Sequence, residues 1–394
     1  MKIFVCHNYY QNLSGEDLAI AEDLRILREH GVQVLEYARA NSEIRRYNLR
    51  EKIAFVMDTV YSLRTSREIE AIVRRDRPDV ALIQNVFPLL SPSIYYKLHQ
   101  LGVPVVQLVY NYRFLCSNAV LYTQGSICER CVKGNHIHAI RFKCYRDSYA
   151  LSALYASTIA FHRHVGDMRK LISAYVTPDL FLKRKLVEGG YPEDRIFPVA
   201  NPFDAEKYQP AVQLGGYFLY FGRIVREKGI FTLLDAIRGL PDIPLIVVGG
   251  GEAEPQAETY TLKHSMSNVK FVGPKYGDEL LEILRGASAV VVPTEWYDNS
   301  PLVICQAFAM GKPVIASNID GIPEVVTHEV DGLLFNPGDA VALREQINHL
   351  HHNPHLCRRY GDNARLKAVR LYTGKRRFTE LVKILNFAMQ RTIH

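Results

Sequence analysis

Two basic residues, Arg223 and Lys228, follow the apolar segment YFLYF (217–221) at its end. Arg can hold an oxyanion with a bidentate fork, whereas Lys acts as a compact point charge. Two fixed cations at the end of a strand can hold a diphosphate, and they can stabilise it as a leaving group if the bond to it breaks.

A second candidate segment, TEWYDNSPLVICQAFAM, covers residues 294–310. Asn299 or Ser300 suits the N-cap of a helix, and Pro301 suits its first turn. The N-terminus of a helix offers free N–H groups and the positive end of a dipole to a phosphate. We therefore expect a phosphate to lie close to this turn.

Other polar and aromatic side chains of the same segment can reach one ligand. Asp298 and Gln306 stand eight positions apart, about two helical turns, so both can lie on one side of the helix. Trp296 and Tyr297 either stack on a ligand or wedge the loop in place.

Four of the seven cysteines, Cys116, Cys128, Cys131 and Cys144, fall within one short stretch. In a chain kept in the cytosol this spacing favours a closed tetrahedral zinc site over disulfides. The alternative is four reduced thiols without a ligand, or a redox pair. A zinc knot would pin a long loop that has no regular period.

Apolar, β-rich runs alternate with segments of helical period along the whole chain. Such alternation predicts parallel βαβ units, and the length of 394 residues predicts two domains. The fold class is therefore α/β with two doubly wound domains, and residues 201–216, rich in Pro and Gly, form the expected linker. Ligands of such sheets bind at the carboxyl ends of the strands.

The charge of the chain is unevenly divided. Residues 1–200 carry 27 Lys and Arg against 20 Asp and Glu, which accounts for the whole formal charge of +7. Either this half meets an anionic partner, or the surplus is an ordinary solvated face. No nucleic-acid partner is expected, because the basic groups lack an interleaved aromatic motif.

The order of several motifs resembles glycosyltransferase family 4, the retaining nucleotide-sugar transferases of GT-B fold. The motifs are GRIVREKG (222–229), VVGGGE (247–252), VKFVG (269–273), the 295–307 stretch, GKPVIAS (311–317) and GIPEVV (321–326). In the first half, MKIFVCHNYYQNLSGED resembles the opening strand and small-residue loop of that family. NVFPLLSP (85–92) and YNYRFLCSN (110–118) resemble its second and third loops at the cleft. The resemblance covers nearly the whole chain.

This resemblance implies two Rossmann-like domains facing across a cleft, the first (1–200, with a Cys-rich insert at 116–144) binding the acceptor and the second (201–371) the donor. Residues 372–394 would form a helix that crosses back to the first domain. Arg223, Lys228 and Asp298 would be the catalytic residues. The remaining donor-binding residues would be Ser14, Gly15, Tyr110, Gly222, Gly273, Lys275, Asn299, Ser300, Pro301, Leu302, Val303 and Gln306.

By the same resemblance, the reaction would move a hexose from a UDP- or GDP-linked sugar to a saccharide or lipid-linked acceptor, and catalysis would need no cofactor. Zinc would be structural only. The protein would be cytoplasmic, and association with the anionic inner face of the cell membrane is a further expectation. No apolar run reaches the roughly 20 residues of a membrane-spanning helix.

The chain departs from the family at several positions. The usual Glu–Glu pair reads Asp298 and Gln306, and Gln84 and Tyr110 stand where many members carry His. Gln306 can still accept from a hydroxyl through its amide oxygen. A catalytically weakened protein that binds nucleotide sugars, or a scaffold on the same fold, is therefore the alternative hypothesis.

Overall fold

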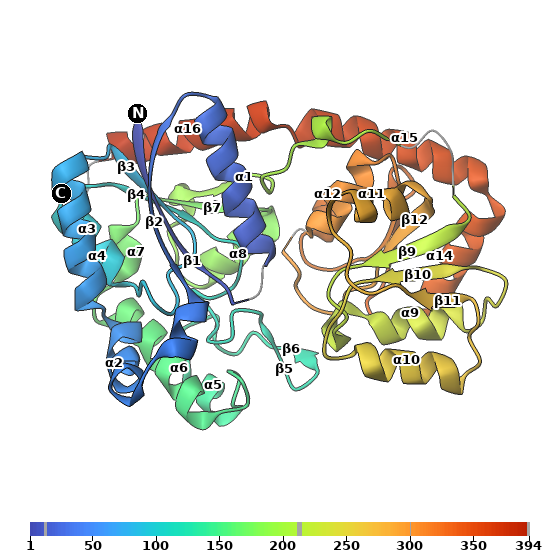
Figure 1. The fold of residues 1–394 in the computed structure, drawn as a ribbon, viewed down its shortest axis with the longest axis horizontal. Helices are drawn as coiled ribbons and strands as arrows, with labels where there is room; N and C mark the ends of the chain where they lie inside the picture. Colours follow the sequence, from blue (N-terminus) through green and yellow to red (C-terminus); the bar gives the residue numbers. More distant parts are fainter. Residues whose placement is uncertain (12–13, 211–214, 300, 392–394) are drawn as a thin grey trace. The chain divides into compact units, whose positions relative to one another are not determined.

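The computed structural model describes residues 1–11, 14–210, 215–299 and 301–391. The chain forms two compact units, one of Met1–Pro202 with Gly374–His394 and one of Phe203–Thr373 (Figure 1). The final helix α16 therefore belongs to the first unit. Among the described helices, none is both long and apolar enough to span a bilayer.

The first unit is built on a parallel six-stranded sheet of order β2-β1-β3-β4-β7-β8. Along this sheet the strand order reverses between β1 and β3, which makes the loops after these two strands the place where a ligand of a doubly wound sheet binds. The strands are β1 Lys2–Tyr9, β2 Gln33–Ala40, β3 Val80–Ile83, β4 Val105–Leu108, β7 Ala174–Thr177 and β8 Ile196–Pro198, with a separate hairpin of β5 Tyr122–Thr123 and β6 Ser126–Ile127.

Buried aliphatic side chains on both faces of the strands explain why the sheet forms. Val5, Leu82 and Val106 lie in one core with Leu24 of α1 and Leu385 of α16, so these two helices cover one face of the sheet. The helices of this unit are α1 Gly15–Glu29, α2 Leu49–Val60, α3 Leu63–Asp76, α4 Ser93–Gln100, α5 Ile137–Arg141, α6 Tyr149–His164, α7 Met168–Leu171, α8 Leu180–Glu188 and α16 Gly374–Gln390.

The second unit repeats this architecture with the sheet order β11-β10-β9-β12-β13-β14, again all parallel. Its strand order reverses between β9 and β12, so the loops after these strands define its switch point. The strands are β9 Tyr217–Phe221, β10 Leu245–Val248, β11 Val269–Phe271, β12 Ala287–Val292, β13 Val314–Ser317 and β14 Gly332–Phe335.

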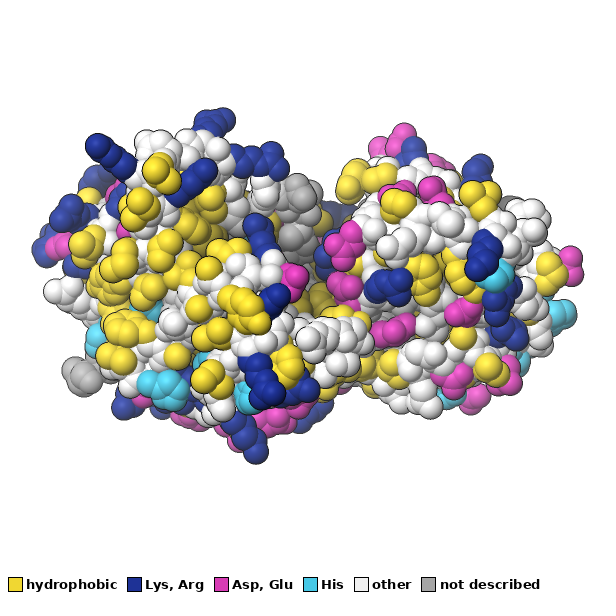
Figure 2. All heavy atoms as spheres, turned by 90° about the horizontal axis from the view of Figure 1, so that it is seen from below, with side chains coloured by type: hydrophobic (Ala, Val, Ile, Leu, Met, Phe, Trp, Pro, Cys, Tyr) yellow, Lys and Arg dark blue, Asp and Glu magenta, His cyan; other side chains and the backbone are white. Residues whose placement is uncertain are grey.

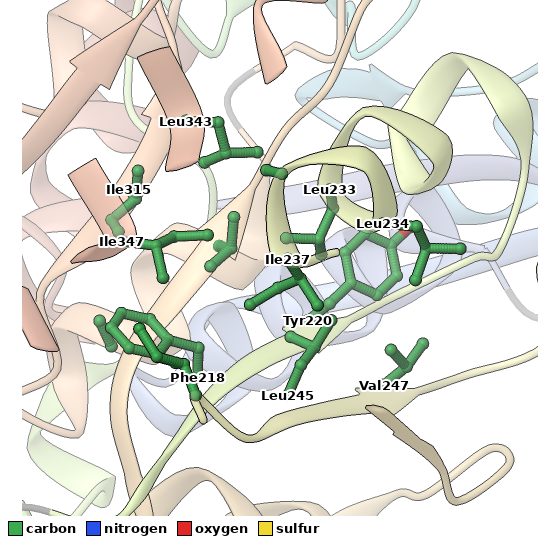
Figure 3. Packing of buried hydrophobic residues seen from close by; sticks show 14 of the residues in the cluster. Phe218, Tyr220, Leu233, Leu234, Ile237, Leu245, Val247, Ile315, Leu343 and Ile347 are labelled. Atoms are coloured by element: carbon green, nitrogen blue, oxygen red, sulfur yellow. The ribbon is translucent and has the colours of Figure 1, made fainter. Parts of the chain in front are cut away.

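The core of the second unit lies between this sheet and helices that cover it (Figure 3). Phe218 and Leu245 of the sheet pack with Leu234 of α9 and with Leu343 and Ile347 of α14. The helices of this unit are α9 Ile230–Ile237, α10 Glu254–Lys263, α11 Gly277–Arg285, α12 Leu302–Ala309, α13 Ile322–Val325, α14 Ala340–His352 and α15 Pro354–Leu371.

Candidate functional site

The loop after β9 carries the two predicted cations. Arg223 is exposed, and its carbonyl accepts a hydrogen bond of 2.6 Å from the hydroxyl of Tyr220. Lys228 ends a short 3-10 helix, and Gly229 follows with φ of 73°. A Cβ at Gly229 would lie 1.7 Å from the carbonyl oxygen of Pro293, so only glycine lets this loop reach the end of β12.

Backbone contacts draw the neighbouring strand ends together. The N–H of Gly222 donates to Val248 over 3.0 Å, and the N–H of Gly249 donates to Gly273 over 3.0 Å. A Cβ at Gly249 would lie 1.8 Å from the carbonyl oxygen of Gly222. The predicted residues Gly222 and Gly273 therefore lie in loops that are both bonded to the end of β10.

Trp296, in the loop after β12, lies against both cations. Its ring centre is 5.9 Å from Cζ of Arg223 and 5.8 Å from Nζ of Lys228, within the range of cation–π attraction. The side chain is buried, and its Nε1 has no hydrogen-bond partner within the described residues. Trp296 was expected either to stack on a ligand or to wedge the loop in place, and its burial favours the second role.

Lys228 also forms an ion pair with Asp298, the third residue predicted to be catalytic. Both side chains are largely buried, which limits screening of the pair by water. Arg223 forms no ion pair with any part of the chain that the structure describes. The site thus presents one open cation, one cation held by a carboxylate, and an aromatic ring against both.

The helix expected near residue 300 begins later than predicted. Its first residue is Leu302, and its N-cap is Pro301, which makes no side-chain hydrogen bond to the helix. Asn299 is therefore not the N-cap. Asn299 adopts a left-handed conformation with φ of 45°, and its N–H donates to Oδ2 of Asp320 over 2.5 Å. Ser300, the other predicted N-cap, lies outside the described residues.

The remaining donor-side predictions fall around the same strand ends. Leu302 and Val303 form the first turn of α12, and Gln306 lies half-buried one turn later. Lys275 lies between β11 and α11, where its ammonium is 3.3 Å from a carboxylate oxygen of Glu279.

In the first unit, Ser14 caps α1 instead of standing free. Its Oγ accepts from the N–H of Asp17 at 3.2 Å, and Asp17 Oδ2 accepts from the N–H of Ser14 at 2.9 Å. A Cβ at Gly15 would meet nothing within 4 Å of the described chain, so the first residue of α1 has open space beside it. The other carboxylate oxygen of Asp17 lies 2.8 Å from Nε2 of His7. Burial raises the pKa of Asp17, but the hydrogen bonds from His7 and Ser14 outweigh this effect and hold the pKa below its usual value.

Tyr110 has a structural partner. Its hydroxyl accepts from Nη2 of Arg377 at 2.7 Å, and the same guanidinium binds both carboxylate oxygens of Asp23 at 2.7 and 2.8 Å. This buried network joins α16 to α1 and to the end of β4. If Tyr110 also bound a sugar, its hydroxyl would have to make that hydrogen bond in addition to the one from Arg377.

Sequence reasoning named Gln84 but missed the polar cluster to which it belongs, at the switch point of the first unit. The carboxylate of Glu16 accepts hydrogen bonds from Asn111 Nδ2 at 2.8 Å and from the hydroxyl of Tyr10 at 3.2 Å. Burial raises the pKa of Glu16, although the hydrogen bond from Asn111 and the charge of Arg113 act in the opposite direction. Glu16 and Arg113 line a cavity of about 20 Å³, enough for one water. Oε1 of Gln84 and Nε and Nη1 of Arg113 are buried there without a partner in the described chain. The position of Gln84 directly after β3, at the end of a buried strand, was the available signal.

The four cysteines lie close to one another, and all are free. Burial, and next the proximity of the other three cysteines, raise the pKa of the Cys131 thiol to about 12. Cys116 donates its thiol hydrogen to Asn118 Oδ1 over 2.9 Å. Across the described residues, however, no three His, Cys, Asp or Glu side chains are arranged to hold a metal ion. The zinc site at Cys116, Cys128, Cys131 and Cys144 therefore gains no support from the structure and stays a prediction.

Comparison with known proteins bears first on the second unit. Residues 209–367 match the family model described as glycosyl transferases group 1. Over 147 residues the chain is 31% identical to the uncharacterized glycosyltransferase MJ1178 of Methanocaldococcus jannaschii, covering 37% of this chain and 41% of the relative. It is 27% identical over 160 residues to the O-antigen chain mannosyltransferase C of Escherichia coli, covering 40% and 43%. The chain thus matches about two fifths of the length of these relatives.

A solved structure extends the likeness to both units. HepE of Anabaena, in complex with UDP, matches 98% of this chain and 100% of its own with a TM-score of 0.69, at 15% sequence identity. The fold is GT-B. In this GT-B chain, the cations Arg223 and Lys228 lie at the switch point of the second unit, where the doubly wound sheet places a ligand.

Proposed function

We propose that this chain is a retaining glycosyltransferase of family 4, which moves a hexose from a nucleotide diphosphate sugar to a hydroxyl of a saccharide or lipid-linked acceptor. The single observation that carries this proposal is the placement of Arg223 and Lys228 against Trp296 after β9 and β12. Two cations at this point fit the two charges of a diphosphate. The match of residues 209–367 to glycosyl transferases group 1 supports the same assignment.

The donor assignment has support from the neighbouring structures. HepE has been solved with UDP and with UDP-glucose. The E. coli relative acts, by its name, in O-antigen chain synthesis as a mannosyltransferase. A nucleotide-linked hexose as donor and a surface saccharide precursor as acceptor are therefore our proposal for this chain.

The chemistry needs one bond to break and one to form on the same face of the sugar. The bond from the anomeric carbon to the diphosphate oxygen breaks, and the acceptor oxygen bonds to that carbon. The acceptor proton passes to an oxygen of the leaving diphosphate, so no strong protein base is required. Arg223 and Lys228 stabilise the charge that develops on the diphosphate, which is the role of fixed cations in phosphoryl and glycosyl transfer. We propose that these two cations suffice without a metal ion.

The pair Lys228–Asp298 favours a second candidate, a protein that binds nucleotide sugars without turning them over. The carboxylate expected to contact the donor sugar, Asp298, forms an ion pair with Lys228. A GT-B protein that only binds would keep the diphosphate contacts and lose the reaction.

Radiolabelled sugar transfer from a panel of UDP- and GDP-sugars to saccharide and polyprenyl-phosphate acceptors tests the proposal. We expect hydrolysis or transfer with at least one donor, and a loss of at least roughly a hundredfold in Arg223→Ala. Stoichiometric binding without turnover would favour the second candidate. Turnover that is equal in wild type and Arg223→Ala would contradict the catalytic assignment.

A further inference from the structure

Helix α2 turns its apolar side outward. Leu49, Ile53, Val56 and Met57 are 74, 65, 46 and 72% exposed. Their spacing of four, three and one positions places them on one side of the helix. Within α2 only Thr59 is buried, so this helix contributes almost nothing to the core of the first unit. The usual orientation of a surface helix is the reverse.

Further apolar side chains border the end of this helix. Tyr61 and Leu63, which follow α2, are 38 and 60% exposed, and Phe161 and Val165 at the end of α6 are 41 and 72% exposed. The two helix ends are joined, because Nε2 of His162 lies 2.7 Å from the carbonyl oxygen of Val60. We call these eight residues, Leu49, Ile53, Val56, Met57, Tyr61, Leu63, Phe161 and Val165, the α2 surface.

The α2 surface is part of an apolar area on the first unit. Figure 2 views the first unit from the side on which α2 and α6 lie in Figure 1, and it shows apolar side chains gathered there, with Lys and Arg and some Asp, Glu and His side chains around them. A contiguous exposed apolar area with a charged border marks an interaction site rather than scattered surface residues.

The charges at the start of α2, from Arg45 to Lys52, are predominantly basic. Arg45 and Arg46 precede the helix and Arg50 and Lys52 stand in its first turns, all of them exposed. The carboxylate of Glu51, which stands among them, accepts the N–H of Asn48 over 2.7 Å and caps the helix. An apolar helix face with cations beside it complements a bilayer whose headgroups are anionic.

We propose that α2 lies in the plane of a membrane surface rich in anionic lipid, with its apolar side inserted among the headgroups. Twelve residues of α-helix are about 18 Å long, too short to cross a bilayer, so the helix must lie along it. The cations beside the helix set the preference for anionic lipid. This inference rests on the surface of the first unit alone and does not depend on the proposed function.

Vesicle co-sedimentation of the full chain tests this inference. The probes are vesicles of phosphatidylcholine alone and of phosphatidylcholine mixed with phosphatidylglycerol. We expect binding to the mixed vesicles and at least tenfold weaker binding to the neutral ones. The double substitution Ile53→Ser with Met57→Ser, and separately Arg50→Ser with Lys52→Ser, should each weaken binding at least tenfold.

Matched control variants come from the second unit. Leu262 and Leu366 are 81 and 66% exposed, and Lys263 and Lys270 are also exposed, but none of them belongs to the α2 surface. Leu262→Ser with Leu366→Ser, and Lys263→Ser with Lys270→Ser, should bind as wild type does. All variants remove exposed side chains only, so an unchanged circular dichroism melt separates loss of binding from loss of fold.

Three results would overturn the inference. They are an absence of wild-type binding to the mixed vesicles, wild-type binding by the Ile53→Ser with Met57→Ser variant, and equal losses in the control variants. A dimer in light scattering that the Ile53→Ser with Met57→Ser variant converts to a monomer would show a second copy, and not lipid, on the α2 surface.

Discussion

The ammonium of Lys228 and the carboxylate of Asp298 form an ion pair across two loops that stand 70 positions apart in the sequence. The pair occupies one of the two cations proposed to hold the donor diphosphate. A diphosphate that binds here must compete with Asp298 for Lys228, or Asp298 must turn to the sugar as Lys228 turns to the phosphate.

The substitution Asp298→Asn tests this competition. Removing the carboxylate leaves Lys228 free, so we expect a nucleoside diphosphate without sugar to bind several-fold more tightly, since such a pair is worth on the order of 1 kcal/mol. Turnover of the nucleotide sugar should fall, because the contact to the sugar hydroxyls is lost. Calorimetry with UDP and GDP measures the first effect and the transfer assay the second. Glu295→Gln, in the same loop, is the control; weaker diphosphate binding in Asp298→Asn would contradict the competition.

The Arg377–Asp23 pair predicts a large effect on stability. Asp23 is fully buried and Arg377 is 4% exposed, and the two join α16 to α1. Arg377→Met would leave a buried carboxylate without its partner, so we expect the free energy of unfolding to fall by about 3–5 kcal/mol. Urea unfolding measures this loss. Lys375→Met, which removes an exposed cation of the same helix, should change stability little, and an equal loss in both variants would contradict the assignment.

His136 predicts a pH dependence of stability. Burial, and next the charges of Arg163 and His164, lower the pKa of His136 to about 4 from its usual 6.5. Both ring nitrogens are buried without a partner in the described residues. The unfolded chain takes up this proton below about pH 6.5 and the folded chain only below about pH 4. Above pH 6.5 this histidine therefore does not lower the free energy of unfolding. As the pH drops from 6.5 to 4, it lowers the free energy of unfolding by about 3 kcal/mol.

Urea unfolding between pH 7 and pH 4 measures that slope. His136→Phe should show a shallower fall than wild type, whereas His355→Phe, at an exposed position, should match wild type. Equal slopes in all three proteins would show that His136 does not stay neutral in the folded chain.

The zinc site remains open to a direct measurement. If the four cysteines bind zinc, the purified protein should contain about one zinc per chain, and a chelator should lower its melting temperature. Cys128→Ser with Cys131→Ser should lose the metal, and Cys305→Ser, a buried cysteine of the other unit, should keep it. Protein without zinc and with chelator-independent melting would leave four reduced thiols.

The alternation of buried strands and helices was predictable from the sequence, because parallel strands covered on both faces read as continuous runs such as YFLYF and LIVV. The positions of Arg223 and Lys228 were also predictable, because both residues lie in the loop that directly follows the segment YFLYF. The ion pair of Lys228 and the network of Arg377 were not, because their partners are distant in the sequence. The hydrogen bond between Asn299 and Asp320 was not visible either, because the two residues stand 21 positions apart.

The outward face of α2 was likewise hidden from the sequence. Its apolar spacing predicts an amphipathic helix whichever way the helix turns, and only the structure shows that Ile53 and Met57 point to solvent. The charge surplus of residues 1–200 was compatible with an anionic partner or with an ordinary solvated face, and it did not point to α2.

The central claim is that Arg223 and Lys228 hold the diphosphate of a nucleotide sugar. Calorimetric titration of UDP and GDP into the full chain tests it most directly, with Arg226→Ala as the control because Arg226 stands in the same loop but contacts Gln256 and Phe231. We predict binding of one of the two nucleotides by wild type and Arg226→Ala, and at least roughly tenfold weaker binding by Arg223→Ala and by Lys228→Ala. Equal affinity in all four proteins, or no binding of either nucleotide, would contradict the claim.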